Sequence, residues 1–257
     1  MERHLKRGRI RLWAVAVWLL VWQGASMAFA RLWPHGHLLL ASPLQALERL
    51  AHLSLTAAFW QAVGGSTLRI VGGFLLSCLL AVVLAALAER FSWLGELLEP
   101  PVATIKAVPV ASFIILALVW LRAEQLSLAI SALMVFPPVY LNVRTGIGAA
   151  NRQLLEMAAV FRVPMMRRLR YLYLPAVLPS FRTAVSLALG LCWKAGIAAE
   201  VIGLPAGTIG EALYRAKVYF ETGDLFAWTA VIVAVSAVFE RGFLKLVDVL
   251  AGKVGRT

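Results

Sequence analysis

Two ionisable residues, Lys194 and Glu200, lie within a long apolar segment that runs from Thr183 to Gly203. A charge at the centre of a membrane costs about 2.5 to 3.5 kcal/mol even on the lenient insertion scale, so each side chain should face protein or water. Positions 194 and 200 are about 120° and about 9 Å apart on a helix, so the two charges are not expected to pair with each other. Each therefore needs a partner of its own.

Two interpretations of these charges stay open. In the structural one, Glu200 reaches the outer membrane interface and Lys194 binds backbone carbonyls of a neighbouring helix. In the functional one, Lys194, with Trp193 beside it, lines a solute pathway, while Glu200 gates or pairs near the outer mouth. A cation buried in a pathway would favour an anionic solute.

A second group of polar residues lies between two apolar segments, from Asn151 to Pro179. The pattern predicts two short helices joined at a break. Asn151 is expected to cap the first helix, because its side chain can accept from backbone N–H groups of the first turn. Pro164 suits the start of the second helix, and Leu174 with Pro175 is expected to end it, because proline lacks a donor and disfavours helix in the preceding residue.

The first of these helices has two unlike faces. Leu154, Ala158 and Phe161 recur at helical spacing and are expected to pack against the rest of the protein. Arg152 and Glu156 lie on the opposite face, where they can form a weak ion pair worth about 0.3 to 0.5 kcal/mol or meet a partner. A solvated basic loop remains the alternative.

The composition places these elements in a membrane. The chain of 257 residues is 61% hydrophobic and only 15% charged, against about 25% charged for a usual soluble domain. We predict an all-α, polytopic membrane protein with six transmembrane helices. The predicted spans cover residues 12–30, 70–88, a segment from after Pro101 to about 121, 126–143 with a break at Pro137 and Pro138, 183–203, and 225–239.

The distribution of basic residues predicts the topology. Six spans put both termini and the 151–179 stretch on one side, which carries 18 Lys and Arg residues against 5 on the other. Basic residues accumulate on the cytoplasmic side. The net charge of +12 is therefore explained by topology, and nucleic acid is not expected as a partner.

Neither a metal site nor a cofactor is predicted. His35, His37 and His52 lack the HxxxH or HExxH spacing of metal ligands, and Cys78 and Cys192 stand alone in apolar runs. A nucleophile, a base and an orienting group do not recur at a recognisable spacing, so no catalytic residue is assigned.

Glu156, Ala158, Leu174 and Pro175 fall at the spacing E-A-A-x3-G-x9-I-x-L-P. In this respect the chain resembles the permease subunits of binding-protein-dependent ABC importers, in which the corresponding cytoplasmic helix-turn-helix docks in a cleft of the ATPase subunit. The resemblance implies that the following residues couple the chain to an ATPase: Glu156, Met157, Ala158, Ala159, Arg162, Leu174 and Pro175.

Three positions depart from that pattern: Met157 replaces its first Ala, Arg162 its Gly and Leu172 its Ile. Glycine suits a tight turn because it tolerates positive φ. We expect Arg162 to make the turn with ordinary backbone dihedrals and to face the ATPase or lipid headgroups.

The segments WKAGIAAEVIGLPAGTIG, AKVYFETGDLFAWT, FERGF and LRIVGGF look like the nitrate, sulfonate and taurine branch of these permeases. The resemblance implies the type I permease fold, a homodimer, two cytoplasmic ATPase subunits and an extracytoplasmic solute-binding protein, in the lipid of a prokaryotic inner or plasma membrane. A heterodimer of permeases stays open. Because the chain has no G-x4-GK[ST] phosphate loop, ATP hydrolysis is expected in a separate subunit and the chain itself is not an enzyme.

Three regions follow along the chain. Residues 1–60 hold a basic segment, the first span and an outer amphipathic segment in which Ser42 caps a helix that starts at Pro43. Residues 61–250 form the core permease domain with its coupling loop at 146–180, and residues 251–257 are a tail. The first span is expected to be uncleaved, although Ala28-Phe29-Ala30 mimics a signal cleavage site.

Two other function classes remain. An ion-gradient-driven secondary transporter would also use broken helices and membrane charges. An intramembrane enzyme would use Lys194, Glu200 or a histidine as acid or base.

Overall fold

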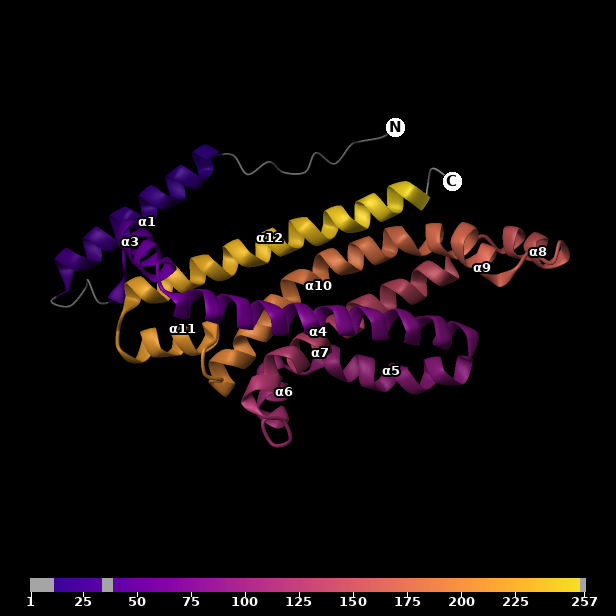
Figure 1. The fold of residues 1–257 in the computed structure, drawn as a ribbon, viewed down its shortest axis with the longest axis horizontal. Helices are drawn as coiled ribbons and strands as arrows, with labels where there is room; N and C mark the ends of the chain where they lie inside the picture. The colour runs from indigo at the N-terminus through magenta and orange to yellow at the C-terminus, as the bar shows by residue number, and fades with distance from the viewer. Residues whose placement is uncertain (1–11, 34–38, 255–257) are drawn as a thin grey trace. The chain divides into compact units, whose positions relative to one another are not determined.

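The computed structural model describes residues 12–33 and 39–254. Within those ranges the chain is helical and has no strand, which confirms the all-α fold class. In order along the chain, the helices are α1 (Leu12–Leu32), α3 (Pro43–Ser54), α4 (Ala57–Arg90), α5 (Ser92–Ala107), α6 (Val110–Ala117), α7 (Ala123–Gly148), α8 (Arg152–Val160), α9 (Met165–Arg168), the π-helical turn η1 (Leu169–Tyr173), α10 (Leu174–Gly203), α11 (Ile209–Val218) and α12 (Thr222–Val254) (Figure 1).

Four helices of the described chain are long and apolar enough to cross a membrane: Trp13–Leu32, Ala57–Arg90, Ala123–Gly148 and Met165–Gly203. A fifth span results if α5 and α6 count as one broken span. The sixth predicted span, 225–239, lies inside α12, which is not one of these five. The polytopic membrane class is confirmed. By length and composition, however, the described chain has four or five candidate spans and not the predicted six.

The third predicted span is not one straight helix. α5 and α6 are bent by 107° at the break between them. Val108 is extended there, with φ −82° and ψ 134°, as expected for a residue that precedes a proline. Pro109 therefore interrupts a segment that its hydrophobicity alone predicted to be one continuous span.

At two other places a proline that was predicted to interrupt a helix does not do so. The predicted break at Pro137 and Pro138 is wrong, because α7 stays helical through both residues. The predicted helix end at Leu174 and Pro175 is also wrong: Pro175 lies in the first turn of α10, directly after η1. In η1 the Leu174 N–H bonds to the Leu169 carbonyl, five residues back. This wider turn gives the proline ring room without ending the helix.

The described chain divides into two compact units, residues 12–33 and 39–60 with 212–231, and residues 61–211 with 232–254. In the first unit, Ser42 caps α3 as predicted, accepting from the Gln45 N–H, with Pro43 at the start of the helix. Arg49 of α3 pairs with Asp224 at the start of α12. The hydrogen bond to Asp224 raises the pKa of the Arg49 guanidinium.

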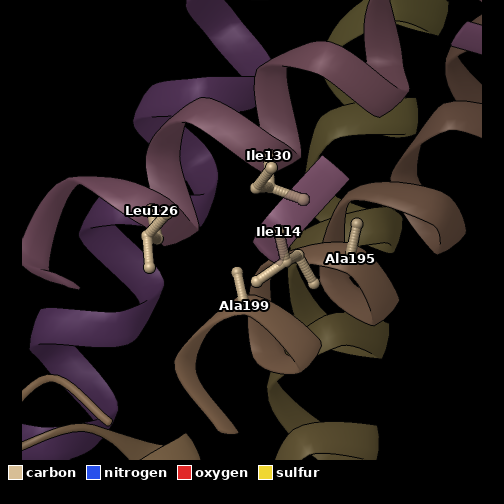
Figure 2. Packing of buried hydrophobic residues seen from close by; sticks show 5 residues of the cluster. All are labelled: Ile114, Leu126, Ile130, Ala195 and Ala199. Atoms are coloured by element: carbon tan, nitrogen blue, oxygen red, sulfur yellow. The ribbon is translucent and has the colours of Figure 1, made fainter. Parts of the chain in front are cut away.

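The second unit is built on α7 and α10, which pack along each other. Figure 2 shows part of its core, in which apolar side chains of α6, α7 and α10 gather; the five labelled residues are Ile114, Leu126, Ile130, Ala195 and Ala199. Close approach of α4 to α7 depends on Gly73, because a Cβ there would lie 2.3 Å from the Leu128 carbonyl oxygen. Small residues at such crossings let helices in a membrane pack tightly.

Candidate functional site

The loop between α7 and α10 begins with a capped helix. The Asn151 side-chain oxygen accepts from the backbone N–H groups of Gln153, at 2.9 Å, and Leu154, at 3.3 Å, which confirms the predicted cap. α8 and α9 lie together at one end of α10 (Figure 1). The loop is therefore an ordered element that projects from the end of a long helix.

The turn after α8 does not have the ordinary dihedrals that we expected. Arg162 has φ +51°, the left-handed region that a glycine would occupy without strain. The Arg162 N–H bonds to the Ala159 carbonyl at 3.1 Å, and the Val163 N–H to the Ala158 carbonyl at 2.9 Å. These two bonds are those of a Schellman motif, which requires a left-handed residue at this position whatever its side chain.

The predicted packing face of α8 is only partly buried. Ala158 is 3% exposed, but Leu154 is 42% and Phe161 75% exposed. Packing of Phe161 against its own chain was therefore predicted wrongly, because the turn at Arg162 places it beyond the end of the helix. Six large apolar side chains are exposed on α8, α9 and the turn between them, and we define them as the apolar loop surface: Leu154, Met157, Val160, Phe161, Met165 and Met166.

Glu156 lies on the exposed side of α8. Its carboxylate accepts from Arg152 Nε at 3.2 Å, and the two side chains are 67% and 91% exposed. The predicted ion pair is confirmed, and at this exposure it contributes only a few tenths of a kcal/mol. The remaining loop residues of the sequence motif are also exposed, namely Ala159, Leu174 and Pro175.

Lys194 lies on an exposed face of α10, and no hydrogen bond or ion pair joins it to another residue of the described chain. Within a single chain no contact supports the interpretation that it binds carbonyls of a neighbouring helix, and its role in a pathway stays a prediction. Exposed residues recur at helical spacing along this face, which we name the α10 stripe: Thr183, Ser186, Leu187, Gly190, Leu191 and Lys194. The neighbouring Trp193 points elsewhere, being 3% exposed, with its ring 6.4 Å from that of Phe239.

Glu200 is fully buried and does not reach an interface. Its Oε2 atom accepts from Ser66 Oγ at 2.7 Å and from the Gly210 N–H at 3.2 Å. Ser66 Oγ in turn accepts from the Ile209 N–H at 3.0 Å. Glu200 and Ser66 thus accept two backbone N–H groups at the N-terminus of α11, which have no acceptor within that helix.

This arrangement was not predicted from the sequence. Residues 66, 200 and 210 belong to α4, α10 and α11, and only the fold brings them together. The one local signal was the sequence GTIG at residues 207–210, within which α11 begins. Among residues 12–33 and 39–254, no group of three His, Cys, Asp or Glu side chains is placed to hold a metal ion.

The long apolar helices and the broken pair are those of a multi-pass membrane protein. The chain belongs to the family described as binding-protein-dependent transport system inner membrane component, which matches residues 73–248. That range includes the loop, the α10 stripe and Glu200.

Several proteins similar to this chain are named as transport permeases. The chain is 28% identical over 238 residues to a putative aliphatic sulfonates transport permease protein SsuC of Bacillus subtilis, covering 91% of this chain and 83% of that protein. It is 29% identical over 216 residues to the Escherichia coli protein of the same name, covering 83% and 80%. To the taurine transport system permease protein TauC of Escherichia coli it is 24% identical over 238 residues, covering 90% and 85%.

Proposed function

We propose that the chain is the permease subunit of an ABC importer that takes up a small anionic solute of the sulfonate or taurine kind. The observation that carries the proposal is the family match over residues 73–248, joined to relatives named for sulfonates and taurine that align over most of the chain. A sulfonate is a permanent anion at neutral pH, and the α10 stripe offers a cation, Lys194, among uncharged residues.

The proposed partner of the loop is a cytoplasmic ATPase. α8 presents Glu156 on its polar side, and the apolar loop surface consists of six exposed apolar side chains. Exposed apolar patches of this kind mark interaction sites. Because the sequence has no phosphate loop, nucleotide chemistry is assigned to that partner, two copies of which would serve a permease dimer.

A second copy of this chain is the proposed partner of the α10 stripe. Lys194 in lipid would be costly, whereas at a contact between two permeases it can face a water-filled pathway. Each subunit would then contribute one cation to a pathway along the shared axis. An exported solute-binding protein would deliver solute at the outer end.

The orientation rests on charge. The 18 basic residues on the side of the loop, against 5 on the other, support an orientation with both termini and α8 in the cytoplasm of a prokaryotic cell. The chain would then lie in the inner or plasma membrane with its coupling loop toward the ATPase.

The experiment is uptake by reconstituted vesicles that contain the chain, the ATPase that co-purifies with it and the solute-binding protein. Radiolabelled taurine and ethanesulfonate are the probes. Uptake that requires ATP hydrolysis and survives collapse of proton and sodium gradients supports the proposal. Uptake that follows an ion gradient without ATP would instead identify a secondary transporter, and chemical conversion of the probe without transport would identify an enzyme.

A further inference from the structure

Arg168 differs from the other arginines of the loop. Arg162, Arg167 and Arg170 are exposed, whereas Arg168 is half-buried. Its guanidinium bonds within the loop: Nε donates to the Val163 carbonyl at 2.8 Å, and Nη2 donates to the Ala158 carbonyl at 2.9 Å. One planar side chain thus joins the start of the second loop helix to the end of the first.

The two carbonyls belong to the turn that carries Arg162. Ala158 is the residue whose carbonyl also accepts the Val163 N–H at 2.9 Å, so Arg168 and the backbone share one acceptor. Carbonyls at a helix C-terminus are unsatisfied and partly negative, which suits a guanidinium. The fork of an arginine can bind two such oxygens at once, and a lysine cannot do so with the same geometry.

This turn needs support of that kind. A left-handed conformation is disfavoured for residues with a Cβ atom, and Arg162 at φ +51° stands where the pattern of such loops has glycine. The backbone bonds of the turn alone must hold this strained residue unless a side chain adds to them. Arg168 supplies the two additional bonds.

We propose that Arg168 is a positioning residue, which locks the Arg162 turn and so holds α8 and the apolar loop surface in the orientation that an ATPase recognises. The proposal rests on the proposed function for its consequence, but the clamp itself is a property of the isolated chain. Its two parts can therefore be tested separately.

The clamp is tested by hydrogen exchange of the purified chain in lipid nanodiscs. Arg168→Ala should speed exchange of the peptide that carries the Arg162 and Val163 amides by about tenfold, the equivalent of losing one hydrogen bond to a charged group. Arg167→Ala removes the same charge from an exposed neighbour and should leave this peptide unchanged. Equal exchange in the wild type and Arg168→Ala overturns the clamp.

Coupling between the two arginines is tested with Arg162→Gly. Glycine accepts the left-handed conformation, so Arg168→Ala should speed exchange far less in the Arg162→Gly background than in the wild type. Arg168→Lys, which keeps the charge but not the fork, should fall between wild type and Arg168→Ala. An equal effect of Arg168→Ala in both backgrounds would contradict a clamp directed at this strained turn.

The positioning role is tested by titrating the purified ATPase onto the same nanodiscs. Arg168→Ala should weaken ATPase binding by about tenfold with an unchanged Tm of the permease. Altered exchange with unchanged ATPase binding overturns the positioning role. If the wild type binds no ATPase, the proposed function fails and the positioning role with it, while the exchange result still decides the clamp.

Discussion

Ser66 of α4 donates a hydrogen bond of 2.7 Å to Glu200 of α10, and both side chains are completely buried. The same two residues accept the first N–H groups of α11, at Ile209 and Gly210. The buried Glu200 side chain thus has a structural role. It ties the start of α11 to two helices that lie far apart in the sequence.

Ser66→Ala should destabilise the chain by about 1 to 3 kcal/mol, because it removes a buried hydrogen bond to Glu200 and leaves the Ile209 N–H without its acceptor. The measurement is thermal unfolding of the purified protein in detergent. Ser236→Ala is the matched control, since that hydroxyl bonds only to the Val233 carbonyl of its own helix. Equal stability of the two variants would contradict the importance of the buried network.

Gly210→Ala should destabilise the same region for a steric reason. A Cβ at this position would lie 2.3 Å from Glu200 Cβ and 2.6 Å from the Val201 nitrogen, so the backbone must move at a cost of about 1 to 3 kcal/mol. At Gly242 of α12 a Cβ meets nothing within 4 Å, and Gly242→Ala should stabilise by about 0.5 to 1 kcal/mol. Unfolding curves of both variants check this; a tolerated Gly210→Ala would show that α11 is less tightly held.

Glu156→Ala should leave the permease inserted and dimeric but reduce solute-stimulated ATP hydrolysis and uptake together. A carboxylate that accepts charge-assisted bonds from a docked ATPase contributes about 1.5 to 3 kcal/mol per bond, whereas the exposed pair with Arg152 contributes only tenths. Both activities are measured in reconstituted vesicles. Arg152→Ala serves as the control for loss of the pair, and normal activities in Glu156→Ala would remove this residue from coupling.

Lys194→Met should raise the apparent KM for uptake of taurine or ethanesulfonate by at least about fivefold, because a unit charge near an anion contributes about 1 to 4 kcal/mol at 4 Å outside the driest environments. Lys194→Arg keeps the charge and should retain most of the uptake. Lys245→Met, which removes an exposed cation from α12, is the control for net charge. Uptake by Lys194→Met at the wild-type KM would place the solute pathway elsewhere.

The basic-residue asymmetry predicts the sidedness of the chain. A reporter fused after Thr257 should be cytoplasmic, and a reporter inserted near Ala206 should be outside. Protease protection in sealed vesicles reads both positions. The reverse labelling would overturn the assignment of the loop to the cytoplasm, and with it the docking of an ATPase there.

Much of the fold was predictable from the sequence because its signals are local. The length and apolarity of the runs predict helices that cross a membrane. Asn151 and Ser42 act on the first turn of their own helices, so both caps were predicted correctly. The spacing of Glu156 to Pro175 predicted the family, since a motif of this kind lies within one loop.

Prolines show where local signals fail. Each lacks a donor, but whether the chain bends, as at Pro109, or continues, as through Pro137 and Pro175, depends on the neighbouring helices and on the register of nearby hydrogen bonds. The number and shape of spans were therefore not settled by hydropathy.

Only the tertiary structure determined the surroundings of Lys194 and Glu200. The sequence predicts that Lys194 and Glu200 need separate surroundings because they are about 120° apart on one helix. It does not specify which side of that helix packs. The fold leaves Lys194 exposed and buries Glu200 against Ser66, because Ser66 belongs to a helix that lies beside α10 only after the chain has folded.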